Sequence, residues 1–519
     1  MRKALRIFII LALPIFVFSG ATGLEAQDFG FGFEDSGAEG EGASSLPLSV
    51  KTGGEISAEL LCYAHDLKNQ DELNAASLGD IFSGSLNFSA AGANVDAYIN
   101  LDLSADSFRE LAAYSADSPH LPRMPDEAYL RAYFGPLSIE AGLRKLTWGK
   151  ADSLGPLDVV NPLDYSDLTN ITAIKAIKIA RPMVRLSWDF GAMSKLEGVF
   201  VPGFAGHRFA GEGRWQPAQF RELSGLVMDD ISSYAFGNYP FLSGYINEQQ
   251  FRALLDSGYG SAFAQLPDTR GLEYTQAGLR YTTTVGSADL GFQYFFGNLF
   301  TPSWGFEGMN SFVDRMIADF TAAAAGGGSL DLATVADLME NLGAPEPAVD
   351  YNRYHQLGLD YAQVLFGFNL RAEFAAHITG DLAGDDGAVR NPFLAWSLGF
   401  DRDLVWGINA NIQCNETIRL LNDSIGDSPV FDCEAGTDMS STRITAQLSK
   451  KFLRDDLELK LTNIWDIEDR GCYIIPALSW TIKDVIAELS AGVFAGREDA
   501  ELGQYWRNSF VKTGIKYSF

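Results

Sequence analysis

Apolar and polar residues alternate with a period of two along much of this chain. The clearest case is the C-terminal stretch 511–519, where Val511, Thr513, Ile515, Tyr517 and Phe519 alternate with lysine, glycine and serine. Successive side chains of a β-strand point to opposite faces, so this pattern predicts a strand with one face in lipid and one in water. The segments 289–296, 443–449 and 457–462 repeat the pattern.

The polar face of these segments carries lysine, arginine and glutamine. Such residues do not suit the core of a soluble β-sandwich, but they suit the water-facing wall of a membrane barrel. A mean hydropathy near zero fits the same fold, because only alternate residues of a membrane barrel need be apolar. The mean hydropathy is −0.01, and 47% of the residues are hydrophobic.

Short and long connections alternate between the expected strands. Short turns are predicted near 91–92, 135–136, 191–192, 286–287, 366–367, 401–402, 454–455 and 483–484. Long connections are predicted near 65–78, 105–126, 148–180, 204–271, 299–351, 379–391, 417–439, 467–470 and 497–504, with helical stretches at 249–255 and 332–342. This rhythm predicts an all-β fold: a transmembrane antiparallel up-and-down β-barrel of about 18 strands (16–18), with periplasmic turns and extracellular loops.

The N-terminus has the features of an export signal. Arg2, Lys3 and Arg6 precede an apolar run of about a dozen residues, too short to span a bilayer as a helix. We expect a signal peptide at 1–26 with cleavage after 21 or 26, a flexible periplasmic lead-in at 27–47, and an outer-membrane barrel at 48–519. No later run of eighteen apolar residues occurs.

The net charge limits the kinds of ligand to expect, and the cysteines limit the possible disulfides. The formal net charge of −28 argues against nucleic acid as a ligand. The acidity fits solubility and acidic outer loops, and the alternative is a lumen that favours cations. Cys414 and Cys433 are predicted to lie in one outer loop and are candidates for a disulfide. Cys62 and Cys472 fall on separate strands and are left unpaired. No metal or cofactor site is predicted.

The third long connection is the strongest candidate for a constriction of the bore. It carries charged and amide side chains. The alternation of side chains along the neighbouring strands predicts that several arginines face the lumen. The constriction candidates are Lys150, Asp152, Asp158, Asn161, Asp164 and Asp167, and the pore-lining candidates are Arg131, Glu140, Arg144, Arg181, Arg185 and Asp189. An acidic connection that folds inward would face these arginines across the bore and create a transverse field. Two alternatives remain open: the arginines pair with glutamates on the wall, and the acidic residues cap turns.

Two segments carry a family resemblance. The terminal strand that ends on Phe519 resembles the last strand of bacterial outer-membrane barrels, which implies recognition by the barrel-assembly machinery. The segment Trp148-Gly149, Asp152, then Asp158-Val159-x-Asn161-Pro162-x-Asp164, is similar to a motif in a family of outer-membrane barrels of unassigned function in diderm bacteria. General porins also place their constricting loop third. The resemblance implies a porin-like channel and names no solute.

Three function classes follow. The leading prediction is a channel for passive diffusion of small polar or charged solutes, with outer-membrane lipid around it and the homo-oligomeric state left open. The alternative is a surface adhesin or receptor whose barrel is plugged by loops. An enzyme is not expected, because the five histidines form no His-Glu-x-x-His motif, and neither a Gly-x-Ser-x-Gly nor a Walker A motif occurs.

Overall fold

The fold was obtained as a computed structural model. It describes residues 49–68, 82–115, 118, 120–219, 229, 232–233, 235–244, 246–259, 267–305, 314–315, 317–319, 321–322, 348–426 and 432–519. The predicted signal peptide, the lead-in and the helix expected at 332–342 lie outside these residues. Among the described residues, no helix is long and apolar enough to cross a membrane.

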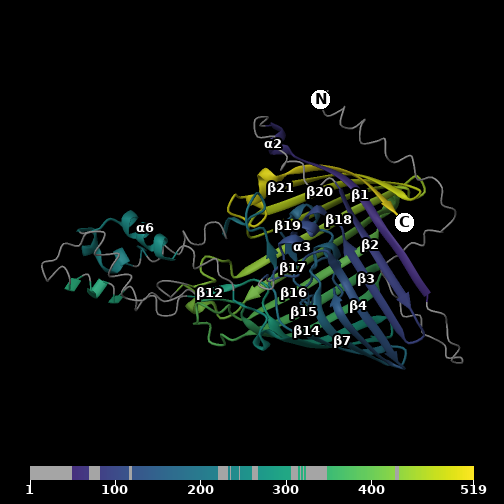
Figure 1. The fold of residues 1–519 in the computed structure, drawn as a ribbon, viewed down its shortest axis with the longest axis horizontal. Helices are drawn as coiled ribbons and strands as arrows, with labels where there is room; N and C mark the ends of the chain where they lie inside the picture. Colours follow the sequence, from purple (N-terminus) through teal and green to yellow (C-terminus); the bar gives the residue numbers. More distant parts are fainter. Residues whose placement is uncertain are drawn as a thin grey trace. The chain divides into compact units, whose positions relative to one another are not determined.

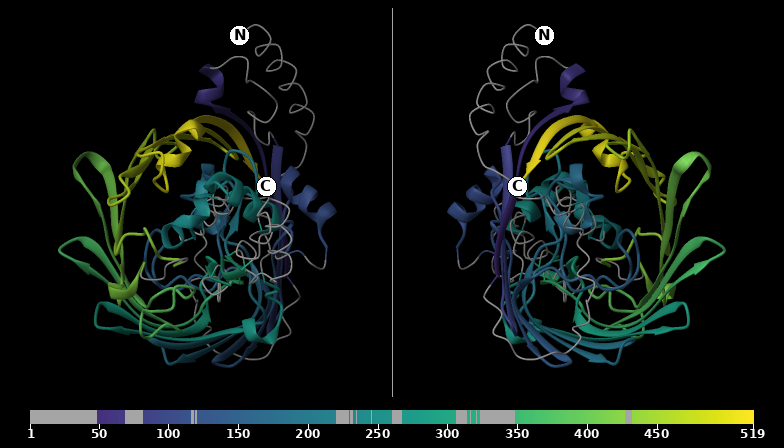
Figure 2. Two further views of the ribbon diagram at one scale, coloured as in Figure 1. Left: turned by 90° about the vertical axis from the view of Figure 1, so that its left-hand side faces the viewer. Right: turned by 90° about the vertical axis from the view of Figure 1, so that its right-hand side faces the viewer.

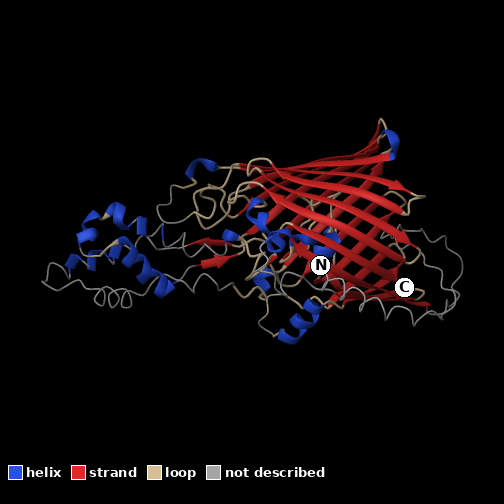
Figure 3. Ribbon diagram, turned by 90° about the horizontal axis from the view of Figure 1, so that it is seen from above, coloured by secondary structure: helices blue, strands red, loops and turns tan. Residues whose placement is uncertain are grey.

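Eighteen strands of the described residues pair into one sheet that closes on itself (Figures 1 and 3). They are β1 (Ser49–Tyr63), β2 (Phe82–Ala91), β3 (Val95–Asp102), β4 (Pro125–Phe134), β5 (Leu137–Arg144), β7 (Arg181–Phe190), β8 (Ser194–Val201), β10 (Gln276–Val285), β11 (Ala288–Asn298), β14 (Arg353–Leu365), β15 (Phe368–Thr379), β16 (Phe393–Asp403), β17 (Ile408–Arg419), β18 (Ser440–Phe452), β19 (Leu457–Asp466), β20 (Gly471–Ile482), β21 (Val485–Ala495) and β22 (Phe510–Ser518). Each strand pairs antiparallel with its neighbours in the chain, and β22 pairs with β1, where Ile56 lies opposite Tyr517. The predicted barrel and strand number are confirmed.

The exterior of the barrel is apolar, as the alternation predicts. On β4, Leu130 and Phe134 are about 60% exposed (59% and 61%), and on β7 Leu186 and Trp188 are also exposed. Because every backbone group of a closed sheet is paired within the wall, such a surface can face hydrocarbon. This is the architecture of proteins that span outer membranes, and the chain is an outer-membrane β-barrel.

Short turns join the strands at one end of the barrel and long connections join them at the other. At the turn between β14 and β15, Phe366 and Gly367 both have positive φ (53° and 78°), the conformation that two-residue hairpins need. One predicted turn was misplaced. A short turn was expected near 401–402, but β16 continues through Asp403, paired with Asn409, and the chain turns at 404–407, where Trp406 has a positive φ.

Smaller elements lie in the long connections. They are the helices α2 (Ala64–Lys68), α3 (Ala105–Ala113), α4 (Ile174–Ile177) and α6 (Glu248–Tyr259), and the short strands β6 (Asp164–Tyr165), β9 (Arg208–Phe209), β12 (Ser303–Gly305) and β13 (Ala348–Asp350). The helix predicted at 249–255 corresponds to α6. β6 and β9 pair in parallel and β12 pairs antiparallel with β13, both apart from the barrel wall.

The predicted disulfide is not present. Cys414 lies within β17, opposite Leu398 and Ile444 on the neighbouring strands, and not in the outer loop where we expected it. Cys433 lies in the connection between β17 and β18. All four cysteines are among the described residues, and all four are free thiols.

Candidate functional site

The connection between β5 and β7, residues 145–180, folds into the barrel. Figure 2 looks along the barrel, and blue segments of the chain fall within the ring of strands in that view. The tip of this connection, Gly149–Leu157, reaches the wall formed by β11 to β17. Glu373 on β15 accepts hydrogen bonds there from three backbone amides, those of Lys150, Ala151 (2.7 Å) and Leu157 (3.3 Å).

A second set of contacts ties the tip to neighbouring strands. The Gln413 side-chain oxygen on β17 accepts from the amides of Asp152 and Ser153, both at 3.0 Å. Gln293 on β11 donates to the Leu157 carbonyl at 3.0 Å, and Gln356 on β14 donates to the Pro156 carbonyl at 2.7 Å. The wall therefore holds the backbone of the tip, and the tip side chains do not make these bonds.

The charged side chains of the tip lie at the edge of this contact. The Asp152 carboxylate pairs with Arg371 on β15 and accepts a hydrogen bond from Asn411 on β17 at 2.9 Å. Arg371 also pairs with Asp401 at 3.0 Å. Lys150 lies 3.8 Å from Asp289. Asp152 and Lys150 keep about 30% of their side-chain surface exposed (29% and 32%).

Asn161 and Asp158 fix the base of the connection. Asn161 bonds the Leu146 amide at 2.8 Å and donates to the carbonyls of Arg144 and Ile179, both at 2.9 Å, so one amide joins the two stems. The Asp158 carboxylate forms a buried ion pair with Lys178 at 2.6 Å. These two residues hold the loop in place and do not face the lumen.

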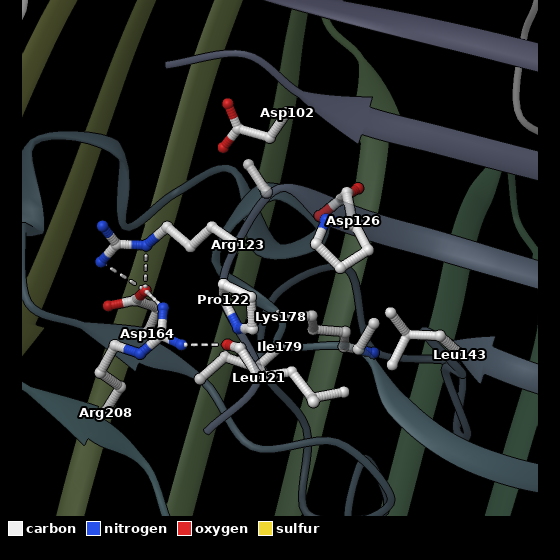
Figure 4. A pocket seen from close by; sticks show the side chains of 13 residues that line it. Asp102, Leu121, Pro122, Arg123, Asp126, Leu143, Asp164, Lys178, Ile179 and Arg208 are labelled. Carbon is white, nitrogen blue, oxygen red and sulfur yellow. Dashed lines mark hydrogen bonds and ion pairs between the residues drawn. The ribbon is translucent and has the colours of Figure 1, made fainter. Parts of the chain in front are cut away.

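Asp164 and Asp167 lie farther along the connection. Asp164 pairs with Arg123 (2.8 Å) and Arg208 (2.9 Å), which come from two other connections (Figure 4). Burial by itself would raise the pKa of Asp164, but the two guanidiniums outweigh it and hold this pKa below the ordinary value. Asp167 accepts from the Thr169 amide at 2.8 Å and caps a short helical turn.

The inward arginines of the wall pair with glutamates of the wall. Arg131, Arg144 and Arg185 all contact the buried Glu140, at 2.9, 2.9 and 2.8 Å. Arg185 also pairs with Glu197 on β8, and the Trp148 indole donates to the same carboxylate at 2.6 Å. Asp152, Asp158 and Asp164 thus meet other cations and Asp167 caps a turn, so the predicted contact with these arginines across the bore is not formed.

The two remaining pore-lining candidates, Asp189 and Arg181, differ in their surroundings. Asp189 lies near the short-turn end of β7, exposed and opposite Lys195 in register. Arg181 is buried at the other end of the same strand, opposite Arg144 in register.

Burial of the inner wall is uneven around the barrel. Under the tip, inward residues on β11, β14 and β15 are almost fully buried: Gln293 is 4% exposed, Gln356 0% and Glu373 3%. On β2, β3 and β18, inward polar residues stay partly exposed, among them Ser85, Asn87, Asn100, Thr445 and Gln447. The connection therefore leaves the polar inner wall accessible on β2, β3 and β18, whereas inward residues of β20 and β21 near the long connections, such as Tyr473 and Phe494, are buried.

Glu373, Gln413 and Arg371 were missed by the sequence-based prediction. Alternation does place them on the inner face of β15 and β17. They lie more than two hundred positions from the residues they bind, and no local pattern links the two segments.

Among the comparisons with known proteins, only the comparison with solved structures finds similar proteins. No family model matches the chain, and no curated protein matches it. A BenF-like porin from Pseudomonas fluorescens Pf-5 is 10% identical over 91% of this chain and 98% of that one, with a TM-score of 0.42. OpdK, an outer-membrane protein of Pseudomonas aeruginosa, is 10% identical over 91% and 99%, also at 0.42. Wzi of Escherichia coli, described as a carbohydrate-binding β-barrel involved in group 1 capsule assembly, is 10% identical over 90% and 84%, at 0.41.

Proposed function

We propose that this protein is an outer-membrane channel through which small polar or charged solutes diffuse passively. The observation that carries the proposal is the uneven burial of the inner wall. A strip of serine and asparagine side chains along β2 and β3 stays partly exposed inside the barrel, as do threonine and glutamine side chains on β18. A polar strip open to water lets a solute exchange its hydration for side-chain contacts as it moves down its concentration gradient.

In this proposal the connection 145–180 is the constriction. The backbone of its tip is fixed to one side of the bore, so the narrowest cross-section lies between the tip and the opposite wall. Lys150 and Asp152 are the charged side chains of the tip that keep exposed surface, and they act on the passing solute. The other predicted residues of the connection act indirectly, because they hold the loop in place: Asp158, Asn161, Asp164 and Asp167.

Two neighbouring residues of β2 provide the test. Asn87 is on the inner face, on the accessible strip, and Leu86 is on the lipid face. The refolded protein is inserted into planar lipid bilayers and its single-channel current is recorded. Asn87→Trp should lower the conductance because the indole fills part of the path, while Leu86→Trp should leave it unchanged.

Equal conductance in both variants would contradict the proposed path. Protein that inserts, shows heat-modifiable migration and passes no current would contradict the channel itself. That result would favour the second candidate, a plugged surface receptor. One observation already favours it: the same connection also contacts the β20–β22 side of the barrel, where Tyr473 donates to the Leu168 carbonyl at 3.3 Å and Lys512 contacts Asn170 at 2.8 Å.

A further inference from the structure

A groove lies on the outer wall of the barrel, across the neighbouring strands β18 to β21 (Figure 1). Its volume is about 620 Å³, which falls within the range of roughly 300–1,000 Å³ that ligand pockets have. Most of its lining consists of outward apolar side chains, and the leucines among them that are 42–49% exposed are Leu448, Leu459, Leu461 and Leu489. Because the outer wall of this barrel faces hydrocarbon, the groove opens to membrane lipid.

Two small side chains explain why the wall is hollow at this place. Pro476 on β20 lies opposite Leu461 on β19, and Ala491 is on the next strand, β21. Both residues line the groove, and both are shorter than the leucines around them. The pairing of β20 with β21 is also interrupted here, since it stops at Ile474 and resumes at Ala477, and proline has no N–H to donate to the ladder. Pro476 and Ala491 therefore form the floor of the groove.

Lys450 places a positive charge at the groove. It lines the groove from the outward face of β18, opposite Leu459 and two residues before the strand ends at a short turn. Its ammonium lies 4.9 Å from the centre of the Phe452 ring, and it forms no ion pair with any residue that the structure describes. Lys460 also adjoins the groove, but its register opposite Ser449 assigns its side chain to the inner face.

The register of the strands relates this charge to the apolar lining. Lys450 is opposite Leu459, Leu459 is opposite Leu478, and Leu478 is opposite Leu489. Lys450 therefore lies at one end of a row of leucines that borders the floor. A ligand that suits this arrangement has a long apolar part for the leucines and a negatively charged group for the lysine, as an anionic phospholipid does.

A second copy of the chain suits the groove less well. The described residues that line the groove include no carboxylate. In a two-fold dimer the same surface patch of each copy meets the other, so two Lys450 side chains would approach each other without an anion. A buried charge that lacks a partner is strongly destabilising. A lipid phosphate supplies the missing negative charge.

We infer that the groove binds one anionic phospholipid from the leaflet at the short-turn end of the barrel. One acyl chain lies over Pro476 and Ala491, and the phosphate lies at Lys450. The head carries a net negative charge, because a zwitterionic head brings its own cation to the phosphate. The site rests on the outer-membrane barrel and not on conduction, so it exists equally in an open channel and in a plugged barrel.

The lipid that the protein retains on extraction tests the inference. The protein is refolded into vesicles of dioleoylphosphatidylcholine with a minor share of dioleoylphosphatidylglycerol, extracted into mild detergent and weighed by native mass spectrometry. The two lipids have the same acyl chains, so a difference between them reports the head. Wild type should retain one phosphatidylglycerol per chain in preference to phosphatidylcholine.

Lys450→Gln tests the contact with the head. Without the ammonium, retention of phosphatidylglycerol should fall about fivefold, the contribution of one lysine near anionic lipid. The control is Lys451→Gln, because Lys451 is the next residue of β18 and faces inward, opposite Glu458. Lys451→Gln should retain the lipid as wild type does.

Ala491→Trp tests the place of the acyl chain. The indole fills the floor of the groove, so the bound phosphatidylglycerol should be lost although Lys450 remains. The control is Ala132→Trp, because Ala132 is on the outward face of β4, opposite the exposed Val95, and does not line the groove. Ala132→Trp should retain the lipid as wild type does.

Three results would overturn the inference. Equal retention of the two lipids by wild type would show an ordinary lipid annulus, and equal retention by wild type and Ala491→Trp would show that the groove is not the site. A wild-type dimer that Ala491→Trp dissociates would show that a second copy fills the groove. If Ala491→Trp fails to insert, Lys450→Gln decides the question, and retention equal to that of Lys451→Gln refutes the site. Because none of these measurements uses current, a failure of the lipid site is distinct from a failure of the channel.

Discussion

Glu140 accepts hydrogen bonds from three guanidinium groups and is the densest charge contact of the inner wall. Its side chain is 4% exposed, and those of Arg131, Arg144 and Arg185 are at most 17% exposed. Glu140→Gln keeps the size of the side chain but removes its charge, so three buried cations lose their common partner. We expect unfolding to become easier by about 3–5 kcal/mol, as for other buried pairs that lose one member. Urea unfolding from lipid vesicles measures this.

The control for Glu140→Gln is Asp499→Asn, which makes the same chemical change in an exposed ion pair with Arg497. Ion pairs at the surface contribute little, so this variant should unfold close to wild type. A loss in Glu140→Gln no larger than in Asp499→Asn would show that the wall arginines do not depend on Glu140.

Asp152 and Asp158 separate the two roles that carboxylates play in the connection. The Asp152 side chain keeps 29% of its surface exposed, whereas that of Asp158 keeps 7% and is bound to Lys178. A charge near the lumen changes the ion preference of a channel, and a buried neutralised pair does not. Asp152→Asn should therefore shift the reversal potential in a salt gradient toward anion preference, because the positive charge of Arg371 remains. Asp158→Asn channels that insert should keep the wild-type value, and equal shifts in both variants would refute this division.

At the residue scale, alternation predicts the face of a side chain but not its partner. Arg131 and Arg185 were expected to face inward and Leu130 and Trp188 to face lipid, and the structure places all four so. Whether the arginines meet the acidic connection or pair with glutamates of the wall was left open, and the structure pairs them with Glu140 and Glu197 on adjacent strands. The pairing of inward charges depends on the register of the strands and on the path of the loops. The alternation of apolar and polar residues specifies neither of them.

The tip of the connection is the element on which the proposed constriction depends, and Gly155 lies where it contacts the wall. A Cβ added to Gly155 would overlap the Glu373 carboxylate and the Ala151 side chain. Gly155→Ala should therefore displace the tip from β15, so that single-channel conductance rises and fluctuates more. Gly211→Ala, in another connection where a Cβ meets nothing within 4 Å, is the matched control and should conduct like wild type. An unchanged current in Gly155→Ala would show that the tip does not set the conductance.

At the element scale, the long alternating strands and the turn residues between them could be predicted, and the short elements could not. The turn near 401–402 was misplaced because Asp401–Asp403 are polar and resemble a turn, although they continue the ladder to Asn409. β6 and β9 have two residues each, too few for any alternation to appear. Their parallel pairing joins the connections after β5 and β8 inside the barrel, and only the structure reveals it.

For the whole molecule, the number and order of strands follow from the rhythm of short and long connections. Up-and-down order places every strand beside its neighbours in sequence, so the sheet order needs no further information. The pairing of β22 with β1 then closes the sheet and leaves no unpaired edge in lipid. The path of the connections within the bore is not fixed by this rhythm, because it depends on contacts between segments far apart in sequence.

The outer surface of the barrel wall faces lipid and the inner surface faces the lumen. Substitutions at two adjacent residues of β18 test this difference. Leu448 faces outward between Ala410 and Leu461, and Gln447 faces inward between Asn411 and Thr462. Leu448→Arg places a charge in hydrocarbon, which costs about 2–4 kcal/mol near the middle of a bilayer. Gln447→Arg places the same charge on the inner face, where Gln447 is partly exposed, and should cost much less. Urea unfolding of both variants from lipid vesicles gives the difference. If the wall were a soluble sheet with water outside, the order would reverse, because an inward arginine would then enter a packed core.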